Sequence, residues 1–546
     1  MNYVPPFLLG MVVTMAWLPV LVRLATRWSI LDQPGARKVH SVPIPRVGGL
    51  AMALGVFIAA FLAIDLQPQD RWFLAAAGVL VIFGALDDRF DLHYRVKLAG
   101  QLLAAGIVLT AGEVQIHTIT LDDRIWLPLW VSLPLTMFFL VGVTNAVNLA
   151  DGLDGLAGGT TFLCLCAVAL LSSVGDQSGG TALALAFAGA VLGFLRFNTY
   201  PASVFMGDAG SQLLGFTIGV LSIRATQAST SEVSAAIPVL LLALPILDTL
   251  SVMVQRVSEG RSPFSADKNH IHHKLLAMGF DHHEAVMVIY LVQADLFVLA
   301  YFLRYESDLL IGGVVSGIFA ASLLIFYLAA RSNWRLRGAR GVDDDSPLTR
   351  LVTAIQQPKL LPLLSYRVIA CSLALYASLI MWKTAQFSID LRLLILGLFA
   401  VTIALLAILR GRPLSLAEKA VVYVTAAVLV YLDAVVGSED RVISVLTWVT
   451  VSGAALATAI RLRLHNDRRF QVTPLDLIVL FMALVVPSLP GPLHLPDGSA
   501  PAIAKLVILF YAIEMLVSRS EGRAAWVRVA AAVVLAGLVI RPLVSS

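Results

Sequence analysis

The stretch that decides the fold is residues 128–159, PLWVSLPLTMFFLVGVTNAVNLADGLDGLAGG. Its first part, 128–147, contains no charged residue and is long enough to cross about 30 Å of hydrocarbon as a helix. Its second part is rich in amides, carboxylates and glycines. The stretch therefore predicts a membrane-spanning helix whose polar end meets the aqueous phase.

Similar apolar runs recur along the whole chain. Of its 546 residues, 58% are hydrophobic and 14% are charged, against about 25% charged in an average soluble domain, and the mean hydropathy is +0.85. This composition excludes a soluble globular fold and predicts an all-α polytopic membrane protein. We expect eleven spans in the first part of the chain, at 4–26, 47–65, 72–86, 95–111, 128–147, 155–174, 179–195, 209–223, 236–256, 285–303 and 309–330.

Basic residues between these spans indicate their orientation. The first span has no basic residue before it and is expected to be retained rather than cleaved as a leader. If the N-terminus is exoplasmic, the cytoplasmic loops hold 16 Lys and Arg residues and the opposite loops hold four. This asymmetry follows the positive-inside rule. The net charge of +4 is scattered between apolar runs and does not support a nucleic-acid partner.

A polar stretch divides the chain. Residues 336–366 predict a linker between a first membrane domain, 1–335, and a C-terminal module, 367–546, in which we expect about seven further spans. Between spans four and five, Val114 to Trp126 alternates apolar and polar residues and predicts a short exoplasmic hairpin.

The third span ends in three acidic residues, Asp87, Asp88 and Asp91. If the helix continues, Asp87 and Asp91 share one face, four residues apart. Carboxylates at a membrane edge are a functional hypothesis by default. The alternative is a solvated helix end paired with Arg89 and Arg95.

The fifth span ends in a run of amides and acids. Asn145, Asn148, Asp151 and Asp154 recur every three residues, which predicts one polar face on a helix end. The intervening glycines allow a ligand to approach the backbone closely. A calcium loop is disfavoured because the downstream Glu of an EF-hand is missing.

Asp208 follows Gly207 at the start of the eighth span. It is interpreted either as the N-cap of that helix or as a carboxylate ligand of Mg²⁺ facing Asn148 and a pyrophosphate. Mn²⁺ is an expected substitute for Mg²⁺.

The longest loop of the first domain, 256–283, carries His270, His272 and His273. A histidine cluster suggests zinc, but Lys268 and Lys274 crowd it. Recognition of phosphate or sugar hydroxyls fits the loop better.

These loops lie on one predicted face of the membrane. They suit a reaction between a phosphorylated lipid and a phosphorylated soluble substrate, in which a divalent ion and basic side chains offset repulsion between two anions. The alternative from another class is an ion-coupled transporter, whose acids are expected near the midplane instead.

Five motifs in this order resemble those of the polyprenyl-phosphate N-acetylhexosamine-1-phosphate transferases, in particular the WecA-like bacterial branch. The resemblance covers about residues 1–335. The motifs are Asp32 to Gly49, the Asp87-Asp88-x-x-Asp91 element with Lys97, Asn145 to Gly155, Phe205 to Ser211, and the His270-Ile-His272-His273 loop. The peptidoglycan branch carries Pro-His-His-His in that loop, so Asn269-His-Ile-His-His argues against a MurNAc-pentapeptide donor.

The resemblance implies transfer of a sugar 1-phosphate from a UDP-N-acetylhexosamine to undecaprenyl or another polyprenyl phosphate, with release of UMP. It implies Mg²⁺ held by Asp208 and Asn148. It also implies a nucleotide site in which Phe205 stacks on uracil, lined by Asn148, Asp151 and Asp154.

The resemblance assigns the other residues to the acceptor and to loops around the substrate. Lys97 and Asp87 match the lipid-phosphate side, and Asp87, Asp88 and Asp208 match the catalytic carboxylates. The remaining matches are a lid over the sugar and diphosphate (Arg261, His270, His272, His273) and a substrate loop (Lys38, Arg46).

The predicted protein is thus an enzyme of the bacterial inner membrane with a cytoplasmic active site. It initiates a cell-envelope glycan such as lipopolysaccharide or exopolysaccharide. The donor is expected to be UDP-GlcNAc, with a UDP-linked 6-deoxy-HexNAc as the alternative. The C-terminal module departs from the family pattern. Membrane lipid is an expected partner of the whole protein, and a second copy of the chain or downstream glycan-assembly proteins are the partners expected for the C-terminal module.

Overall fold

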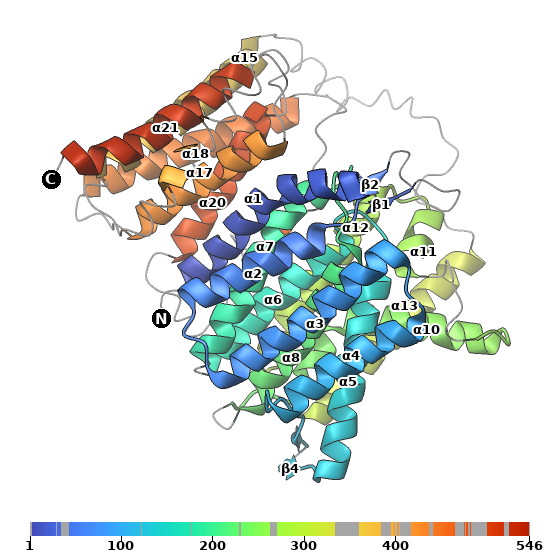
Figure 1. Ribbon diagram of the computed structural model, residues 1–546. Coiled ribbons are helices and arrows are strands. Elements are labelled where there is room, and N and C mark those ends of the chain that lie inside the picture. The colour runs from blue at the N-terminus through green and yellow to red at the C-terminus, as the bar shows by residue number, and fades with distance from the viewer. Residues whose placement is uncertain are drawn as a thin grey trace. The chain divides into compact units, whose positions relative to one another are not determined.

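A computed structural model describes two parts of the chain (Figure 1). The described residues are 3–28, 30–33, 43–121, 123–175, 177–228, 231–262, 270–332, 360–383, 395–397, 399–400, 403, 416–435, 441–464, 474, 477–478, 481, 499–517 and 524–544. The chain forms two compact units, one mainly before residue 340 and one mainly after it. Each unit is described by itself.

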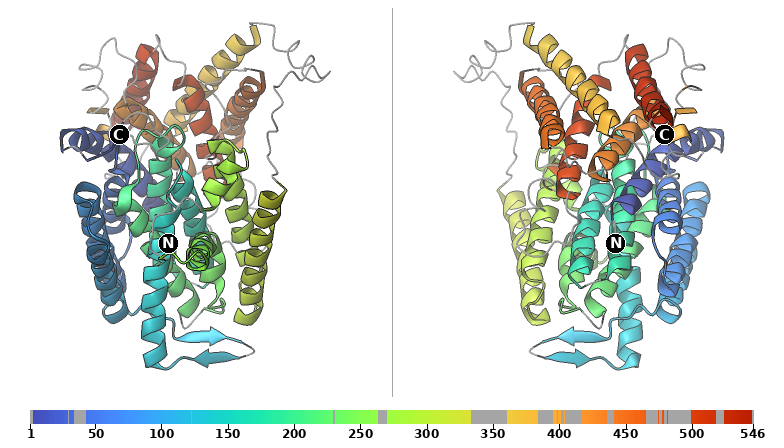
Figure 2. Two further views of the ribbon diagram at one scale, coloured as in Figure 1. Left: turned by 90° about the vertical axis from the view of Figure 1, so that its right-hand side faces the viewer. Right: turned by 90° about the vertical axis from the view of Figure 1, so that its left-hand side faces the viewer.

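The first unit is a helical bundle whose members run side by side (Figure 2). Its helices are α1 (Val4–Trp28), α2 (Gly48–Ala63), α3 (Pro68–Phe90), α4 (Tyr94–Thr110), α5 (Leu129–Ala150), α6 (Leu156–Val174), α7 (Ser178–Asn198), α8 (Gly207–Gln227), α9 (Ile237–Leu241), α10 (Ala243–Ser258), α11 (Ile271–Ala277), α12 (His282–Phe302) and α13 (Asp308–Arg331). Each predicted span coincides with one of these helices, except that the ninth span is divided between α9 and α10.

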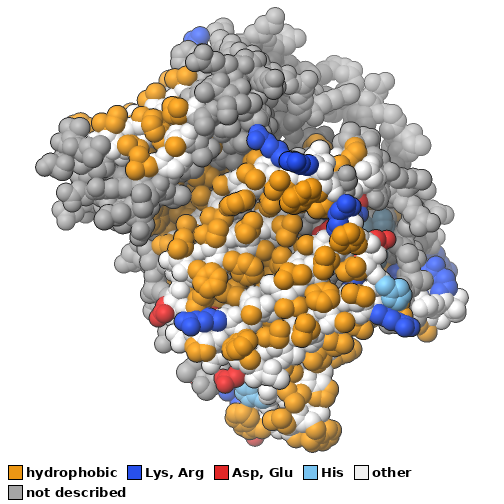
Figure 3. Space-filling model, in the orientation of Figure 1, with side chains coloured by type: hydrophobic (Ala, Val, Ile, Leu, Met, Phe, Trp, Pro, Cys, Tyr) orange, Lys and Arg blue, Asp and Glu red, His pale blue; other side chains and the backbone are white. Residues whose placement is uncertain are grey.

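The all-α membrane fold is confirmed. Seven helices in the described part of the chain are long and apolar enough to cross a membrane, and four shorter helices are also apolar. Hydrophobic side chains cover much of the face shown in Figure 3, and charged side chains lie mostly toward its margins. The count of eleven crossings in the first domain stays a prediction.

The core of the first unit is built on α6, α7 and α8, which are buried along most of their length. Helix α1 packs against α2 and α7, α3 against α4 and α8, and α5 against α8. Small residues permit such close packing. A Cβ atom at Gly49 of α2 would lie 2.1 Å from the backbone nitrogen of Gly210 of α8, so these two helices touch through their backbones.

A proline explains the break in the ninth span. Pro245 has no N–H group, and its ring clashes with the carbonyl four residues earlier, that of Leu241. The freed carbonyl accepts a hydrogen bond from Gln293 Nε2 of α12 at 2.9 Å. The span predicted over 236–256 is therefore helical, but it is divided at Leu242.

Two small antiparallel sheets accompany the helices. β3 (Thr118–Thr120) pairs with β4 (Arg124–Trp126), which confirms the hairpin predicted from alternation. β1 (Leu31–Asp32) pairs with β2 (Ile44–Pro45), which the sequence analysis did not predict.

The second unit is also helical. Its described helices are α15 (Leu360–Lys383), α17 (Leu416–Val435), α18 (Arg441–Leu464), α20 (Ser499–Val517) and α21 (Ala524–Val544). α15 begins inside the range predicted as linker, and residues 336–359 of that range lie outside the described part. The predicted count of seven further spans stays a prediction.

A buried ion cluster ties three helices of the second unit together. Asp433 of α17 lies 3.0 Å from Lys383 Nζ of α15 and 2.6 Å from Lys505 Nζ of α20. Tyr376 also donates a hydrogen bond to this carboxylate. Asp433 therefore joins α15, α17 and α20.

Candidate active site

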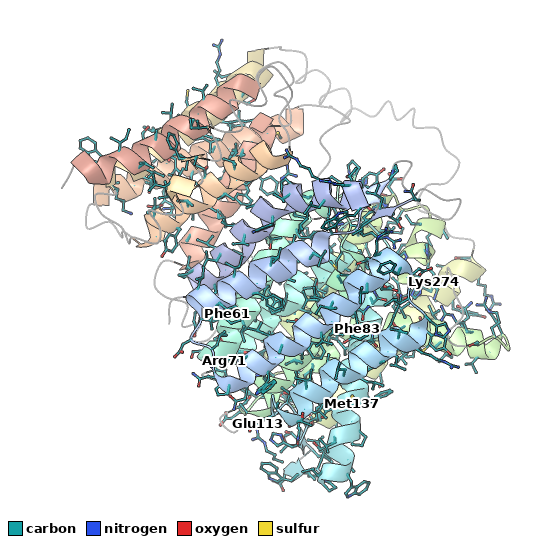
Figure 4. The ribbon with its side chains drawn as sticks, viewed as in Figure 1. Phe61, Arg71, Phe83, Glu113, Met137 and Lys274 are labelled. Carbon is teal, nitrogen blue, oxygen red and sulfur yellow. The ribbon has the colours of Figure 1, made fainter. Side chains whose placement is uncertain are left out.

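Four helix ends carry predicted motifs to one place in the first unit. α3 and α5 end there, and α4 and α8 begin there, with α3 packed on α4 and α8 and α5 packed on α4 and α8. In Figure 4, Arg71 near the start of α3 and Glu113 lie at the other end of the unit from Lys274 of α11. The motifs therefore converge at one end of the bundle, as the sequence predicted.

Lys97 lies between two of the predicted carboxylates. Its Nζ is 2.5 Å from Asp87 Oδ2 and 2.9 Å from Asp208 Oδ2. The other oxygen of Asp87 accepts the backbone N–H of Leu92 at 2.7 Å. Both oxygens of Asp87 are thus engaged, and its main effect is to hold the lysine.

Asp88 holds the beginning of α8. Its carboxylate accepts hydrogen bonds from the backbone N–H groups of Asp208 at 2.9 Å and Ala209 at 3.1 Å. The first N–H groups of a helix have no partner within the helix, and a negative charge there is favourable. Gly207 has φ +72°, and a Cβ atom there would lie 2.4 Å from Asp88 Oδ2. Only glycine fits this junction.

Asp208 is not the N-cap of α8. The cap position is Met206, and Asp208 stands in the first turn. Asn148 Nδ2 donates to Asp208 Oδ1 at 3.0 Å and to Ser211 Oγ at 2.7 Å. The structure therefore joins Asp208, Asn148 and Lys97 from three motifs.

The charges of this cluster favour a cation. Asp87 and Asp208 both contact the ammonium group of Lys97, and Asp88 lies beside them at the start of α8. The nearby Arg46 is paired with Asp32. Carboxylate and amide oxygens are the ligands that Mg²⁺ prefers. Both hydrogen bonds of Asn148 use Nδ2, which leaves its Oδ1 for a metal. The donor set fits the ion that the sequence predicted.

The turn after α5 differs from the prediction. The helix ends at Ala150, so Asp151 and Asp154 do not continue the face of Asn148. The chain leaves the helix because Asp151 has non-helical angles and Gly155 is left-handed, with φ +80°. Asp151 is exposed. Asp154 Oδ2 accepts the backbone N–H of Ala202 at 2.9 Å, so Asp154 anchors the loop before α8.

A similar correction applies to Asp91. It is the C-cap of α3 in a left-handed conformation, with φ 51°. The helix has ended before Asp91, and the face predicted to be shared with Asp87 does not form.

Phe205 is held through its backbone. Its N–H donates to Pro45 O at 2.8 Å, and its carbonyl accepts from Gly48 N–H at 2.9 Å. The ring is half-buried. These bonds link the predicted substrate loop to the loop before α8. Within that substrate loop, Arg46 pairs with Asp32, and Lys38 lies outside the described residues.

The histidine loop reaches the turn after α5. A Cβ atom at Gly152 would lie 2.3 Å from His272 Nε2, so that ring lies against the Gly152 backbone. The rings of His272 and His273 are 4.2 Å apart. Burial lowers the pKa of His272 to about 4. At neutral pH His272 is therefore an uncharged hydrogen-bonding group and not a cation for phosphate.

Of the other lid residues, Arg261 is exposed and pairs with Glu259 at 3.0 Å. His270 is buried and lies 2.9 Å from Asp248 of α10. In the described part, Asp281, His283 and Glu284 form another group with metal-ligand types. The capping box of α12 accounts for two of them.

Several residues of this region were not predicted from the sequence. Asp248 sits in an apolar helix, and Asn198 Oδ1 accepts the N–H of Gly155 at 3.0 Å. Gln101 exchanges hydrogen bonds with the amide of Asn145. The one signal that the sequence offers for these residues is a polar residue within an apolar run.

Comparisons with known proteins show which proteins this chain is similar to. The model of the family described as Glycosyl transferase family 4 matches residues 71–226, which contain the Lys97 cluster. A probable undecaprenyl-phosphate N-acetylglucosaminyl 1-phosphate transferase of Bacillus subtilis is 37% identical over 291 residues, covering 52% of this chain and 80% of the relative. The chain belongs to the polyprenyl-phosphate sugar-1-phosphate transferases.

Two further relatives are similar to a comparable share of the chain. A decaprenyl-phosphate N-acetylglucosaminephosphotransferase of Mycolicibacterium smegmatis is 36% identical, over 50% of this chain and 75% of the relative. The undecaprenyl-phosphate alpha-N-acetylglucosaminyl 1-phosphate transferase of Escherichia coli K12 is 29% identical, over 58% of this chain and 87% of the relative. This transferase is therefore a multi-pass membrane enzyme that moves a sugar 1-phosphate, and about half of its length is shared with such relatives.

Proposed function

We propose that the enzyme transfers N-acetylglucosamine 1-phosphate from UDP-GlcNAc to a polyprenyl phosphate, with undecaprenyl phosphate as the expected acceptor, in a reaction that requires Mg²⁺. An oxygen of the lipid phosphate forms a bond to the β-phosphorus of the donor. The bond between that phosphorus and the bridging oxygen breaks, and UMP leaves with the bridging oxygen. The product is a sugar-diphospho-lipid that initiates a cell-envelope glycan.

The observation that carries this proposal is the position of Lys97 between Asp87 and Asp208. A lysine held by two carboxylates presents a fixed positive charge where two phosphate groups would meet. Such a charge offsets repulsion between acceptor and donor phosphates. The relatives' names give a polyprenyl phosphate and an N-acetylglucosamine phosphate group, which supports this choice of acceptor and transferred group.

The acceptor needs no strong base. A phosphate monoester has a second pKa of about 6, so it is largely ionised at neutral pH. Both oxygens of Asp87 are occupied, by Lys97 and by the N–H of Leu92. We therefore assign to Asp87 the positioning of Lys97 and not the removal of a proton.

The donor diphosphate would lie between Asp208, Asn148 and the turn at Asp151. Asp208 and Asn148 Oδ1 would hold Mg²⁺, which when bound neutralises charge on the diphosphate. Phe205 would stack on the uracil, and the loop carrying His272 would cover the sugar and diphosphate.

The membrane orientation is part of the proposal. The distribution of basic residues supports a cytoplasmic active site and an exoplasmic N-terminus. A soluble nucleotide sugar is made in the cytoplasm, which fits an active site on that face of the bacterial inner membrane.

The test is transfer of radiolabel into lipid. Purified protein is incubated with undecaprenyl phosphate, Mg²⁺ and UDP-GlcNAc labelled in the sugar, and lipids are extracted. Label in the organic phase supports the proposal. A parallel reaction with a UDP-linked 6-deoxy-HexNAc identifies the donor, and absence of lipid label with every donor contradicts the proposal.

A further inference from the structure

A buried carboxylate and imidazole form a pair at the base of the histidine loop. Asp248 of α10 is 4% exposed and His270 is 7% exposed. Asp248 Oδ2 lies 2.9 Å from Nδ1 of His270. Asp248 Oδ1 accepts the backbone N–H of Ile271 at 2.8 Å. One carboxylate therefore holds both the ring of His270 and the first residue of α11.

This contact defines the tautomer of His270. An ionised carboxylate can only accept hydrogen bonds, so the ring nitrogen facing it carries the hydrogen. The hydrogen is then on Nδ1 of His270, and Nε2 is the atom available to a substrate. The partner of one ring nitrogen commonly sets the chemistry of the other in this way.

The carboxylate of Asp248 also fixes the position of His272. α11 has seven residues, too few to be stable alone, and its first N–H is held by Asp248. The ring of His272 on α11 is parallel to that of His270, at 5.8 Å between centroids with an angle of 6°. His272 in turn lies against Gly152, in the turn after α5. Asp248 thus connects α10 to the turn that carries Asp151.

We propose that Asp248 is a positioning residue for the transfer reaction. It fixes the His270 ring with Nε2 free and fixes α11 so that His272 covers the Gly152 turn. The proposal rests on the proposed function, in which this loop covers the sugar and diphosphate. An amide of the same size could accept the Ile271 N–H, but it would present an N–H donor to His270 and reverse the tautomer.

The two roles of Asp248 can be separated by substitution. Asp248→Asn keeps an acceptor for Ile271 and changes only the group that faces the imidazole. His270→Gln removes the imidazole, and the double variant completes a cycle. The matched control is Asp70→Asn, since Asp70 is also fully buried and pairs with Arg224 at 2.7 Å near the beginning of α3. Thermal unfolding of each variant reports whether the bundle is intact.

We expect Asp248→Asn to lower kcat at least about 10-fold while KM for the lipid acceptor changes less than about threefold. The double variant should be no slower than His270→Gln, because both substitutions act through one ring. Asp70→Asn should lower the unfolding temperature and leave kcat per folded enzyme close to wild type.

Nitrogen NMR of ¹⁵N-histidine-labelled protein tests the tautomer without any activity. The His270 signals, assigned by their loss in His270→Gln, should show a protonated Nδ1 in the wild type and a protonated Nε2 in Asp248→Asn. An unchanged tautomer, kcat within threefold of wild type for Asp248→Asn, or multiplied losses in the double variant would each overturn the inference. If the wild type transfers no sugar phosphate, the proposed function fails, and the NMR result then decides only whether Asp248 sets the tautomer of His270.

Discussion

Nζ of Lys97 lies 2.9 Å from Oδ2 of Asp208, which is 111 residues later in the sequence. The same ammonium group lies 2.5 Å from Asp87. The two carboxylates would repel each other without it, and neither belongs to the helix that carries the lysine. The site therefore exists only when α3, α4 and α8 are packed together.

Asp208→Asn should keep the shape of this cluster and remove one negative charge. We expect turnover to fall at least about 100-fold, equivalent to about 2.7 kcal/mol of barrier, because a metal ligand and a partner of Lys97 are lost. Initial rates at saturating substrates measure this effect. Turnover within a few-fold of wild type, in protein with unchanged thermal unfolding, would show that Asp208 has only a packing role.

The main expected effect of Asp88→Asn is a loss of stability. Asp88 accepts two backbone N–H groups at the start of α8, and losing such a cap costs about 0.5–2 kcal/mol. We expect a lower unfolding temperature together with reduced turnover, because α8 positions Asp208. The control is Asp91→Asn, an exposed residue three positions later. Equal stability of the two variants would refute the capping role of Asp88.

Activity should depend on a hard divalent cation. EDTA should abolish transfer, and Mg²⁺ or Mn²⁺ should restore it, because carboxylate and amide oxygens select such ions. Rates after chelation and metal addition provide the measurement. Restoration by zinc alone, with bound zinc lost when His270, His272 and His273 are replaced, would move the metal site to the histidine loop.

The residues after Asp345 should be dispensable for the chemistry. The residues assigned to the site precede Arg331, and the first unit has its own core in α6, α7 and α8. A protein truncated after Asp345 should retain transferase activity in membranes, although its unfolding temperature can fall. A truncated protein that inserts, folds and binds UDP-sugar but does not turn over would mean that residues 346–546 contribute to the active site.

Much of the fold could be predicted because the length of an apolar run is a local property. The sequence also predicts that Asp87, Asn148 and Asp208 lie near one another, because the span ends that carry them are expected on the same face of the membrane. Helix ends were harder to predict. Asp91 and Asp154 were assigned to helical faces, but the chain takes non-helical angles at Asp91 and Asp151, before those faces form.

Asp248 shows what a single sequence does not reveal. It lies in a mostly apolar part of α10, and its partners His270 and Ile271 lie 22 and 23 residues later. The local pattern marks it as a polar residue within an apolar run, but does not identify its partners. The break at Leu242 was similarly hidden, because Pro238 and Pro245 are compatible with a kinked continuous helix until the Leu241 carbonyl is seen to bond Gln293.

The most direct measurement of the central claim follows the two phosphorus atoms of the donor separately. UDP-GlcNAc labelled with ³²P at the β-phosphate should pass its label to the chloroform-soluble lipid. The same donor labelled at the α-phosphate should leave its label in the aqueous phase as UMP. The Asp208→Asn variant should transfer the β-label and release UMP at least about 100-fold more slowly. Lipid product that carries labelled sugar without the β-phosphorus, or α-label in the lipid, would contradict sugar-1-phosphate transfer by this enzyme.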